Sequence, residues 1–125
     1  MSTEFEKVLD FQKKVLKTNL PLRGIQSVTK DFEEKTTTFI NEEVLELAAA
    51  FKAQDKAEIA DALIDIIYFS MGAIAQMGVP FHKAFEDVHK ANMAKKKGVK
   101  AERGLEGDAT KPAKWVAPDL NKYFK

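Results

Sequence analysis

Apolar residues recur with helical spacing along most of the chain. Residues 4–17 place apolar side chains three or four positions apart, and the segment that follows, TNLPLRG, contains a proline and a glycine that end a helix. A second helix is expected to begin between Ser27 and Asp31 and to reach Gln54, although the threonines of KTTTF, residues 35–39, have weak helix propensity. The pattern predicts two helices here, with a kink or a boundary left open at the threonines.

Two more helices are predicted in the second half of the chain. Asp55 suits the N-cap of the third, with Glu58 three residues later as its capping-box partner. The glycine and proline of MGVP end this helix and begin the fourth, which should run from Pro80 to Lys97. The apolar stripe of the fourth helix continues into polar and cationic positions, so its last turns should present Asn92, Lys95 and Lys96.

The segment from Gly98 onward has a different composition. Three glycines, two prolines and scattered charges argue for an extended arm, and Trp115 is among the side chains that give this arm something to bury. No strand pattern and no internal repeat stand out in the sequence. The expected fold is therefore all-α, with a four-helix core over residues 1–97 and an arm over residues 98–125 that packs on the core or on a neighbouring subunit.

Three carboxylates interrupt the apolar third helix. At 100° per residue, Glu58, Asp61 and Asp65 fall within one arc of roughly 60°, while apolar side chains occupy most of the remaining circumference. This apolar face is far wider than that of an ordinary surface helix. Carboxylates at the edge of a buried helix are costly unless they are paired, hydrogen-bonded or bound to metal. Something should compensate them.

A second acidic group precedes the third helix, in NEEVLEL. Two helices joined by a short turn lie antiparallel, so Glu43 and Glu46 should face the acidic stripe of the third helix, whereas Glu42 is expected to face solvent. A cluster of four or five carboxylates repels itself unless some are protonated or cations lie between them. Such oxygen ligands suit a hard divalent cation such as Mg²⁺. A solvated acidic face is the alternative for Glu43 and Glu46.

Composition narrows the kind of site. The chain has 125 residues, 45% of them apolar and 31% charged, which fits one globular domain. It has no cysteine and two histidines, so a metal site would use oxygen ligands. A di-iron bundle needs two Glu-x-x-His pairs, and only one, Glu86 and His89, is present. No transmembrane run and no cleavable signal are visible, so a cytoplasmic protein is expected.

Charge is unevenly distributed along the chain. Residues 1–89 carry 10 basic and 15 acidic side chains, a net charge of −5, and residues 90–125 carry 10 and 4, a net charge of +6. The basic end favours binding to phosphate groups. Direct binding to nucleic acid is not favoured, because no nucleic-acid-binding motif accompanies the basic residues.

The two acidic groups also carry a resemblance. The stretch INEEVLELAAAF…DKAEIADALIDIIYF resembles the ExxE and ExxD signature of the MazG-like all-α nucleoside triphosphate pyrophosphohydrolases. The likeness extends over roughly residues 4–121, toward a bacterial and phage branch related to phosphoribosyl-ATP pyrophosphohydrolase. It implies a four-helix bundle assembled as a dimer or a dimer of dimers, that is, a homodimer or homotetramer. It also implies Mg²⁺-dependent hydrolysis, with Mn²⁺ as a substitute, of a nucleoside triphosphate, usually a deoxynucleotide, to the monophosphate and pyrophosphate.

The resemblance also implies roles for individual residues. Glu43, Glu46, Glu58 and Asp61 occupy the metal-binding positions of the signature, and Asp65 is a second candidate for the last of them. Either Glu43 or Glu46 would orient or deprotonate the attacking water, as the catalytic carboxylate. Asn92 and Lys95 match the positions of the fourth helix that are expected to contact sugar or phosphate, and Gln12 stands where many relatives have histidine. From its place at the end of the fourth helix, Lys96 is a further candidate for contact with substrate phosphates, and Trp115 and Asn19 are candidates for contact with the base.

Two alternatives remain at this stage. One is phosphoribosyl-ATP hydrolysis in histidine synthesis, because the metal chemistry is shared and the motif does not separate the two substrates. The other is a non-catalytic helical module with a basic tail that binds nucleic acid or a partner protein. The acidic stripes argue against the second alternative, because a binding scaffold gives no reason for them.

Overall fold

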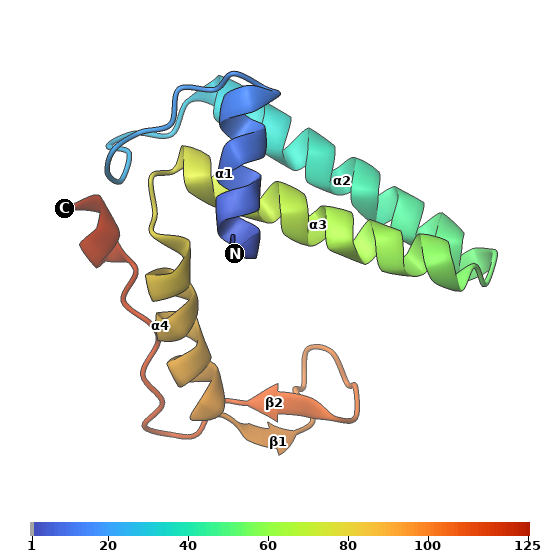
Figure 1. The fold of residues 1–125 in the computed structure, drawn as a ribbon. Helices are drawn as coiled ribbons and strands as arrows, with labels where there is room; N and C mark the ends of the chain where they lie inside the picture. The colour runs from blue at the N-terminus through green and yellow to red at the C-terminus, as the bar shows by residue number, and fades with distance from the viewer. Residues whose placement is uncertain (1) are drawn as a thin grey trace. The chain divides into compact units, whose positions relative to one another are not determined.

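The computed structural model describes residues 2–125 and is mostly helical (Figure 1). Its elements are α1 (Glu4–Lys14), α2 (Lys30–Lys52), α3 (Lys56–Gln76), α4 (Phe81–Met93), β1 (Lys96–Gly98), β2 (Asp108–Thr110) and the 3₁₀ helix η1 (Asn121–Phe124). The predicted all-α class is confirmed, because the two strands have only three residues each. The chain forms two compact units, residues 2–81 with Phe124 and residues 82–123 with Lys125.

Side-chain caps start the first three helices. Thr3 and Glu6 form a complete capping box at α1. The Thr29 hydroxyl accepts a hydrogen bond from a first-turn backbone N–H of α2 at 3.1 Å, and Asp55 does the same for α3 at 3.1 Å. These bonds satisfy backbone donors that have no partner inside a helix, so the helices begin close to where the sequence predicts.

The structure shows whether α2 is interrupted at its threonines and where α1 and α4 end. The threonines at 36–38 do not interrupt α2, which is continuous from Lys30 to Lys52; the Thr37 hydroxyl donates to the Glu33 carbonyl at 2.8 Å. The first helix ends at Lys14 rather than at Lys17, whose φ of 54° is left-handed. The fourth helix ends at Met93, so the prediction that it reaches Lys97 was wrong.

The structure also contains one short β-hairpin, for which no strand pattern stands out in the sequence. β1 pairs antiparallel with β2, with Lys96 opposite Thr110 and Gly98 opposite Asp108. Arg103 closes the connecting loop by donating to both carboxylate oxygens of Asp108, at 2.8 and 2.9 Å. Three-residue strands of sequence KKG and DAT are too short to show an alternating pattern, so pairing and the Arg103 contact define them.

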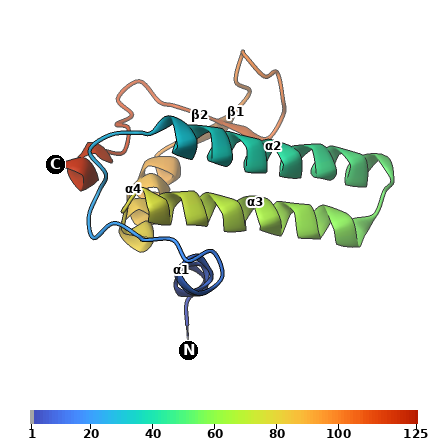
Figure 2. The ribbon, with the colours of Figure 1, turned by 90° about the horizontal axis from the view of Figure 1, so that it is seen from above.

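In the first unit, α2 and α3 form a long antiparallel hairpin, and α1 packs against α3 (Figures 1 and 2). The buried positions of the hairpin are small residues, Ala50, Ala62, Gly72 and Ala75, which allow the helix backbones to approach closely. Many large apolar side chains of the hairpin remain exposed: Phe39, Val44, Leu45, Phe51, Leu63, Ile64, Ile67 and Phe69.

The connection after α3 is held by a glycine. Gly78 has a φ of 70°, and a Cβ atom there would lie 2.1 Å from the Arg23 carbonyl oxygen. Beside it, the Ile25 backbone N–H donates to the Met77 carbonyl at 3.0 Å, which joins the α1–α2 loop to the end of α3. Within residues 2–125, no single helix combines the length and apolarity needed to cross a membrane.

Candidate active site

Acidic residues and a pocket lie one after the other along the facing sides of α2 and α3. On α3, Asp65, Phe69, Gly72 and Gln76 follow one another at helical spacing on one face. On α2, Glu43 lies one turn beyond Phe39, and the rings of Phe39 and Phe69 are 5.8 Å apart. The antiparallel hairpin therefore places carboxylates one turn from an aromatic contact.

Glu43 is the centre of the acidic group. Its side chain is half-buried, and its Oε2 atom is buried without a hydrogen-bond partner. Burial raises the pKa of Glu43 above its usual value of 4.5, and the charges of Glu46 and Asp65 and hydrogen bonding with both raise it further. A carboxyl group that holds its proton more tightly than usual, beside two other acids, has the character of an acid–base residue.

The remaining acidic candidates lie outside this group. Glu58 and Asp61 are exposed and are not among the groups that shift the Glu43 pKa, and Glu42 is exposed as well. Of the two aspartates that the sequence leaves open, Asp65 is the one that interacts with Glu43. The structure thus brings together three of the five predicted metal ligands.

The acidic group has the right chemistry for a hard cation, but its side chains do not converge on a single point. Within residues 2–125, no set of three or more acidic or histidine side chains is arranged to hold a metal ion. The donors are nevertheless all carboxylate oxygens, and one of them, Glu43 Oε2, is buried with nothing to compensate it. In the described part of the chain, no lysine or arginine forms an ion pair with Glu43, Glu46 or Asp65. Oxygen ligands without a protein counter-charge suit Mg²⁺ chemically.

A pocket of about 570 Å³ opens next to the acidic group, between α1, α2 and α3. Gln12, which is only 6% exposed, accepts a hydrogen bond from the side-chain amide of Gln76 at 2.9 Å. Gly72 leaves room for this pair, because a Cβ atom there would lie 2.7 Å from Gln12 Nε2. The pocket is also lined by Asn19 and by five aromatic rings, those of Phe11, Phe32, Phe39, Tyr68 and Phe69.

This pocket has the size and chemistry of a ligand site. Ligand pockets commonly measure about 300–1,000 Å³ and combine aromatic walls with a few polar groups. A planar heteroaromatic ring with hydrogen-bonding edges matches aromatic walls and a carboxamide pair. The sequence predicts Gln12 and Asn19 here but not Gln76, whose one available signal is that it is the last residue, and the only amide, of the apolar stretch SMGAIAQ.

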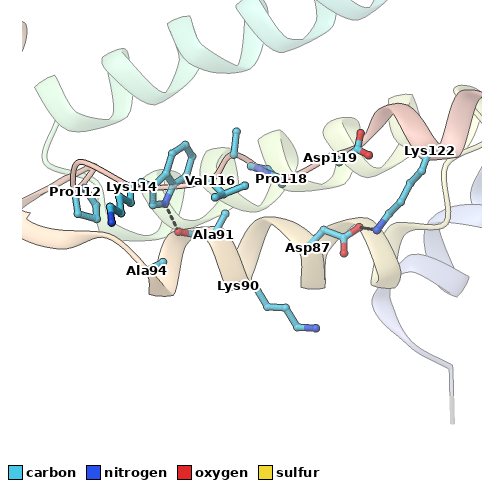
Figure 3. Close-up of a pocket in the computed structure, with 12 residues that line it drawn as sticks. Asp87, Lys90, Ala91, Ala94, Pro112, Lys114, Val116, Pro118, Asp119 and Lys122 are labelled. Atoms are coloured by element: carbon cyan, nitrogen blue, oxygen red, sulfur yellow. Dashed lines mark hydrogen bonds and ion pairs between the residues drawn. The ribbon is translucent and has the colours of Figure 1, made fainter.

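The other predicted substrate-binding residues lie in the second unit. Asn92 is exposed on α4, whereas Lys95 follows the helix and Lys96 begins β1. Trp115 packs on α4 by donating its indole N–H to the Ala91 carbonyl at 2.7 Å, drawn as a dashed line in Figure 3.

The C-terminal segment runs along α4 and borders a pocket of about 470 Å³ (Figure 3). At the far end of this pocket, Asp87 accepts hydrogen bonds from the Tyr123 hydroxyl and from Lys122 Nζ, the latter at 3.0 Å. The Tyr123 hydrogen bond, followed by the Lys122 ammonium, holds the pKa of Asp87 below its usual value. Sequence reasoning did not identify this second anchor, because an aspartate on a helix and a tyrosine 36 positions later share no local pattern.

Comparison with known proteins identifies the family. The sequence model of the phosphoribosyl-ATP pyrophosphohydrolase family matches residues 4–92, which include both acidic motifs, Gln12 and Gln76. No curated protein shows significant similarity to the chain. The match confirms the resemblance seen in the sequence, and the family is one of hydrolases that act on phosphoric anhydrides. The chain belongs to the phosphoribosyl-ATP pyrophosphohydrolase family, within the MazG-like nucleotide pyrophosphohydrolase superfamily.

Proposed function

We propose that the protein hydrolyses a nucleoside triphosphate, preferably a deoxynucleotide, to the monophosphate and pyrophosphate in a Mg²⁺-dependent reaction. One observation carries the proposal: the half-buried Glu43 carboxyl group, beside Glu46 and Asp65, lies one helical turn from a pocket suited to a nucleobase. Membership of a nucleotide pyrophosphohydrolase family supports the same reaction class.

Glu43, Glu46 and Asp65 are the residues that would hold Mg²⁺, with Mn²⁺ as a substitute; Glu58 and Asp61 are the further candidates that the sequence signature offers. A divalent ion bound there supplies positive charge against the triphosphate and makes water more acidic. Either Glu43 or Glu46 would orient or deprotonate the attacking water, and Glu43 is favoured because its side chain is half-buried and its Oε2 atom has no hydrogen-bond partner. Glu46 would orient this water from the next turn of α2.

The pocket of α1, α2 and α3 would receive the base. Its aromatic rings provide flat apolar walls, and the Gln12–Gln76 pair offers a hydrogen-bond donor and an acceptor to the edge of a ring. Positioning accounts for most of the catalysis in phosphoryl chemistry, so a base held one turn from Glu43 fixes where the α-phosphate can lie.

The family match favours a second candidate substrate. Phosphoribosyl-ATP gives the family its name, and it undergoes the same cleavage between the α- and β-phosphates. Phosphoribosyl-ATP, which has a larger base substituent, would place its triphosphate near the same carboxylates. It would differ from a simple nucleotide only in how it fills the pocket.

Incubation with Mg²⁺ and a panel of substrates tests the proposal. The panel contains each dNTP, each NTP and phosphoribosyl-ATP, and the assay measures monophosphate, pyrophosphate and orthophosphate separately. We expect equal amounts of monophosphate and pyrophosphate, with the fastest turnover for one deoxynucleotide. Turnover of phosphoribosyl-ATP alone would select the second candidate, and release of orthophosphate alone would reject the pyrophosphohydrolase reaction.

A further inference from the structure

The C-terminal segment carries a tryptophan that is fixed in place on α4. The Trp115 indole N–H donates to the Ala91 carbonyl at 2.7 Å, in the last turn of α4, where this carbonyl also accepts from the Ala94 backbone N–H at 3.3 Å. Its backbone N–H donates to the Pro112 carbonyl at 2.9 Å, which forms a turn. One hydrogen bond therefore holds the indole ring on α4 and the other holds the backbone that carries it, and we call this ring the Trp115 platform.

Two lysines from different strand ends meet at this platform. Lys95 Nζ lies 5.4 Å from the centre of the Trp115 ring, and Lys111 Nζ lies 4.9 Å from it. The hairpin explains the meeting: Lys96 pairs with Thr110, so the next position outward places Lys95 opposite Lys111. The pairing of β1 with β2 thus brings two lysines that are 16 residues apart in the sequence to the same tryptophan ring.

The positive charges of Lys95 and Lys111 are not balanced by acidic side chains of the described chain. Like charges directly opposite each other in a strand pair destabilise it, and cation–π contacts at exposed sites compensate only partly. Among residues 2–125, neither Lys95 nor Lys111 forms an ion pair with an acidic side chain, although Arg103 and Lys122 in the same unit do. A small, multiply charged anion between the two ammonium groups would remove the repulsion.

We propose that Lys95, Lys111 and Trp115 form a binding site for a diphosphate group. A diphosphate is compact and carries enough negative charge to engage two opposed ammonium groups, each of which can donate to it. The choice of a diphosphate rests on the proposed function, which produces pyrophosphate. All three residues lie beyond residue 92, where the family match ends.

Titration with inorganic pyrophosphate tests the site directly. Trp115 is the only tryptophan of the chain, so its fluorescence reports on the two lysines without a label. With the full-length, metal-free protein at constant ionic strength, we expect a saturable change with pyrophosphate and a much weaker one with sulfate. Absence of a saturable change, or equal binding of sulfate, would overturn the proposal.

Variants separate the site from general surface charge. Lys111→Ala should weaken pyrophosphate binding about tenfold or more, because a charge-assisted hydrogen bond is lost, and Lys111→Arg should largely restore it. Lys114→Ala is the matched control: it removes a lysine of the same segment that lines the neighbouring pocket, and it should leave binding unchanged. Equal affinity of Lys111→Ala and the wild type, or equal losses in both alanine variants, would overturn the assignment.

Pyrophosphate binding to Trp115→Phe, which lacks the tryptophan signal, is measured by calorimetry. Trp115→Phe keeps an aromatic ring but removes the N–H that bonds Ala91, so the platform should loosen and pyrophosphate affinity should fall. Wild-type affinity in Trp115→Phe would contradict the platform role. Direct binding also keeps the two proposals distinct: a protein that binds pyrophosphate through Lys111 but cleaves no nucleotide would reject the proposed function alone.

Discussion

At the scale of single residues, Glu43 is the most unusual side chain of the first unit. Its carboxyl group is partly buried, one oxygen has no partner, and two other acids lie beside it. Such a group costs stability in the absence of a cation, because burial and like charge both oppose its ionised form. A residue that lowers stability but suits chemistry is typical of an active site.

Glu43→Gln should therefore stabilise the metal-free protein at pH 7. The amide keeps the size of the side chain and removes the charge that burial, Glu46 and Asp65 oppose. Thermal unfolding in a chelator should show a higher Tm for Glu43→Gln than for the wild type, whereas Glu42→Gln, an exposed neighbour, should match the wild type. Saturating Mg²⁺ should reverse the order, because ligand at 100 times its Kd adds about 2.7 kcal/mol to the protein that binds it. A lower Tm for metal-free Glu43→Gln would contradict this interpretation.

Gly72→Ala tests the glutamine pair of the pocket. The added Cβ would lie 2.7 Å from Gln12 Nε2, the mobile end of a side chain, so the helix should stay folded while Gln12 is displaced. We expect KM for the preferred nucleotide to rise about two- to tenfold with little change in kcat, and Gln76→Ala to have the same effect. Gln54→Ala, in the turn between α2 and α3, is the control. Unchanged KM in both pocket variants would exclude the pair from base binding.

At the scale of elements, the C-terminal segment is attached to α4 by a pH-dependent anchor. The Tyr123 hydroxyl and the Lys122 ammonium lower the pKa of Asp87 from its usual 3.8. A carboxyl group with a lowered pKa in the folded state contributes stability above its unfolded pKa, and this contribution disappears as the pH falls through the folded value. The anchor should therefore hold at pH 5 and weaken below about pH 3.8.

Tyr123→Phe measures the anchor. The variant should unfold at a lower temperature than the wild type above pH 4, and the difference should shrink as the pH is lowered toward 2, because protonated Asp87 no longer favours the bond. Tyr68→Phe, in the first unit, should show a difference that does not depend on this titration. A Tyr123→Phe difference that is the same at pH 7 and pH 2 would show that Asp87 does not carry the bond.

Most of the helices can be predicted from short stretches of sequence, whereas the β-hairpin of β1 and β2 cannot. The threonine and aspartate caps and the glycine after α3 are visible in the sequence, because each acts within a few residues. The acidic faces of α2 and α3 follow from the period of 3.6 residues. By contrast, β1 and β2 are paired across a loop that the contact between Arg103 and Asp108 closes. Gln76 likewise lines the pocket as the hydrogen-bond donor to Gln12, a residue far away in the sequence. Contacts between distant segments leave no periodic signal.

At the scale of the whole molecule, the first unit has large apolar side chains that remain exposed to solvent in the single chain. Leu45 and Ile64, on α2 and α3, are 71% and 60% exposed. Large exposed apolar side chains on both helices of one hairpin favour a surface that another subunit covers. We therefore propose, in agreement with the dimer or tetramer that the sequence suggests, that the protein is a homo-oligomer.

Sedimentation at micromolar concentration should show a dimer or a tetramer. Leu45→Glu should weaken association at least tenfold, because burying a leucine contributes about 1.5–3 kcal/mol. Leu105→Glu is the control: Leu105 is 61% exposed but belongs to the loop of the β-hairpin. A wild-type protein that sediments as a monomer would contradict the proposed assembly.

Pyrophosphate release by three proteins under one condition tests the central claim, that the Glu43 group is the hydrolytic centre. Wild type, Glu43→Gln and Glu42→Gln are incubated with the preferred nucleotide and Mg²⁺. We predict that Glu43→Gln loses at least about 100-fold in kcat while it keeps the helical content of the wild type. Glu42→Gln should retain activity within about twofold, because its side chain is exposed and lies outside the group. Wild-type turnover by Glu43→Gln would contradict the account.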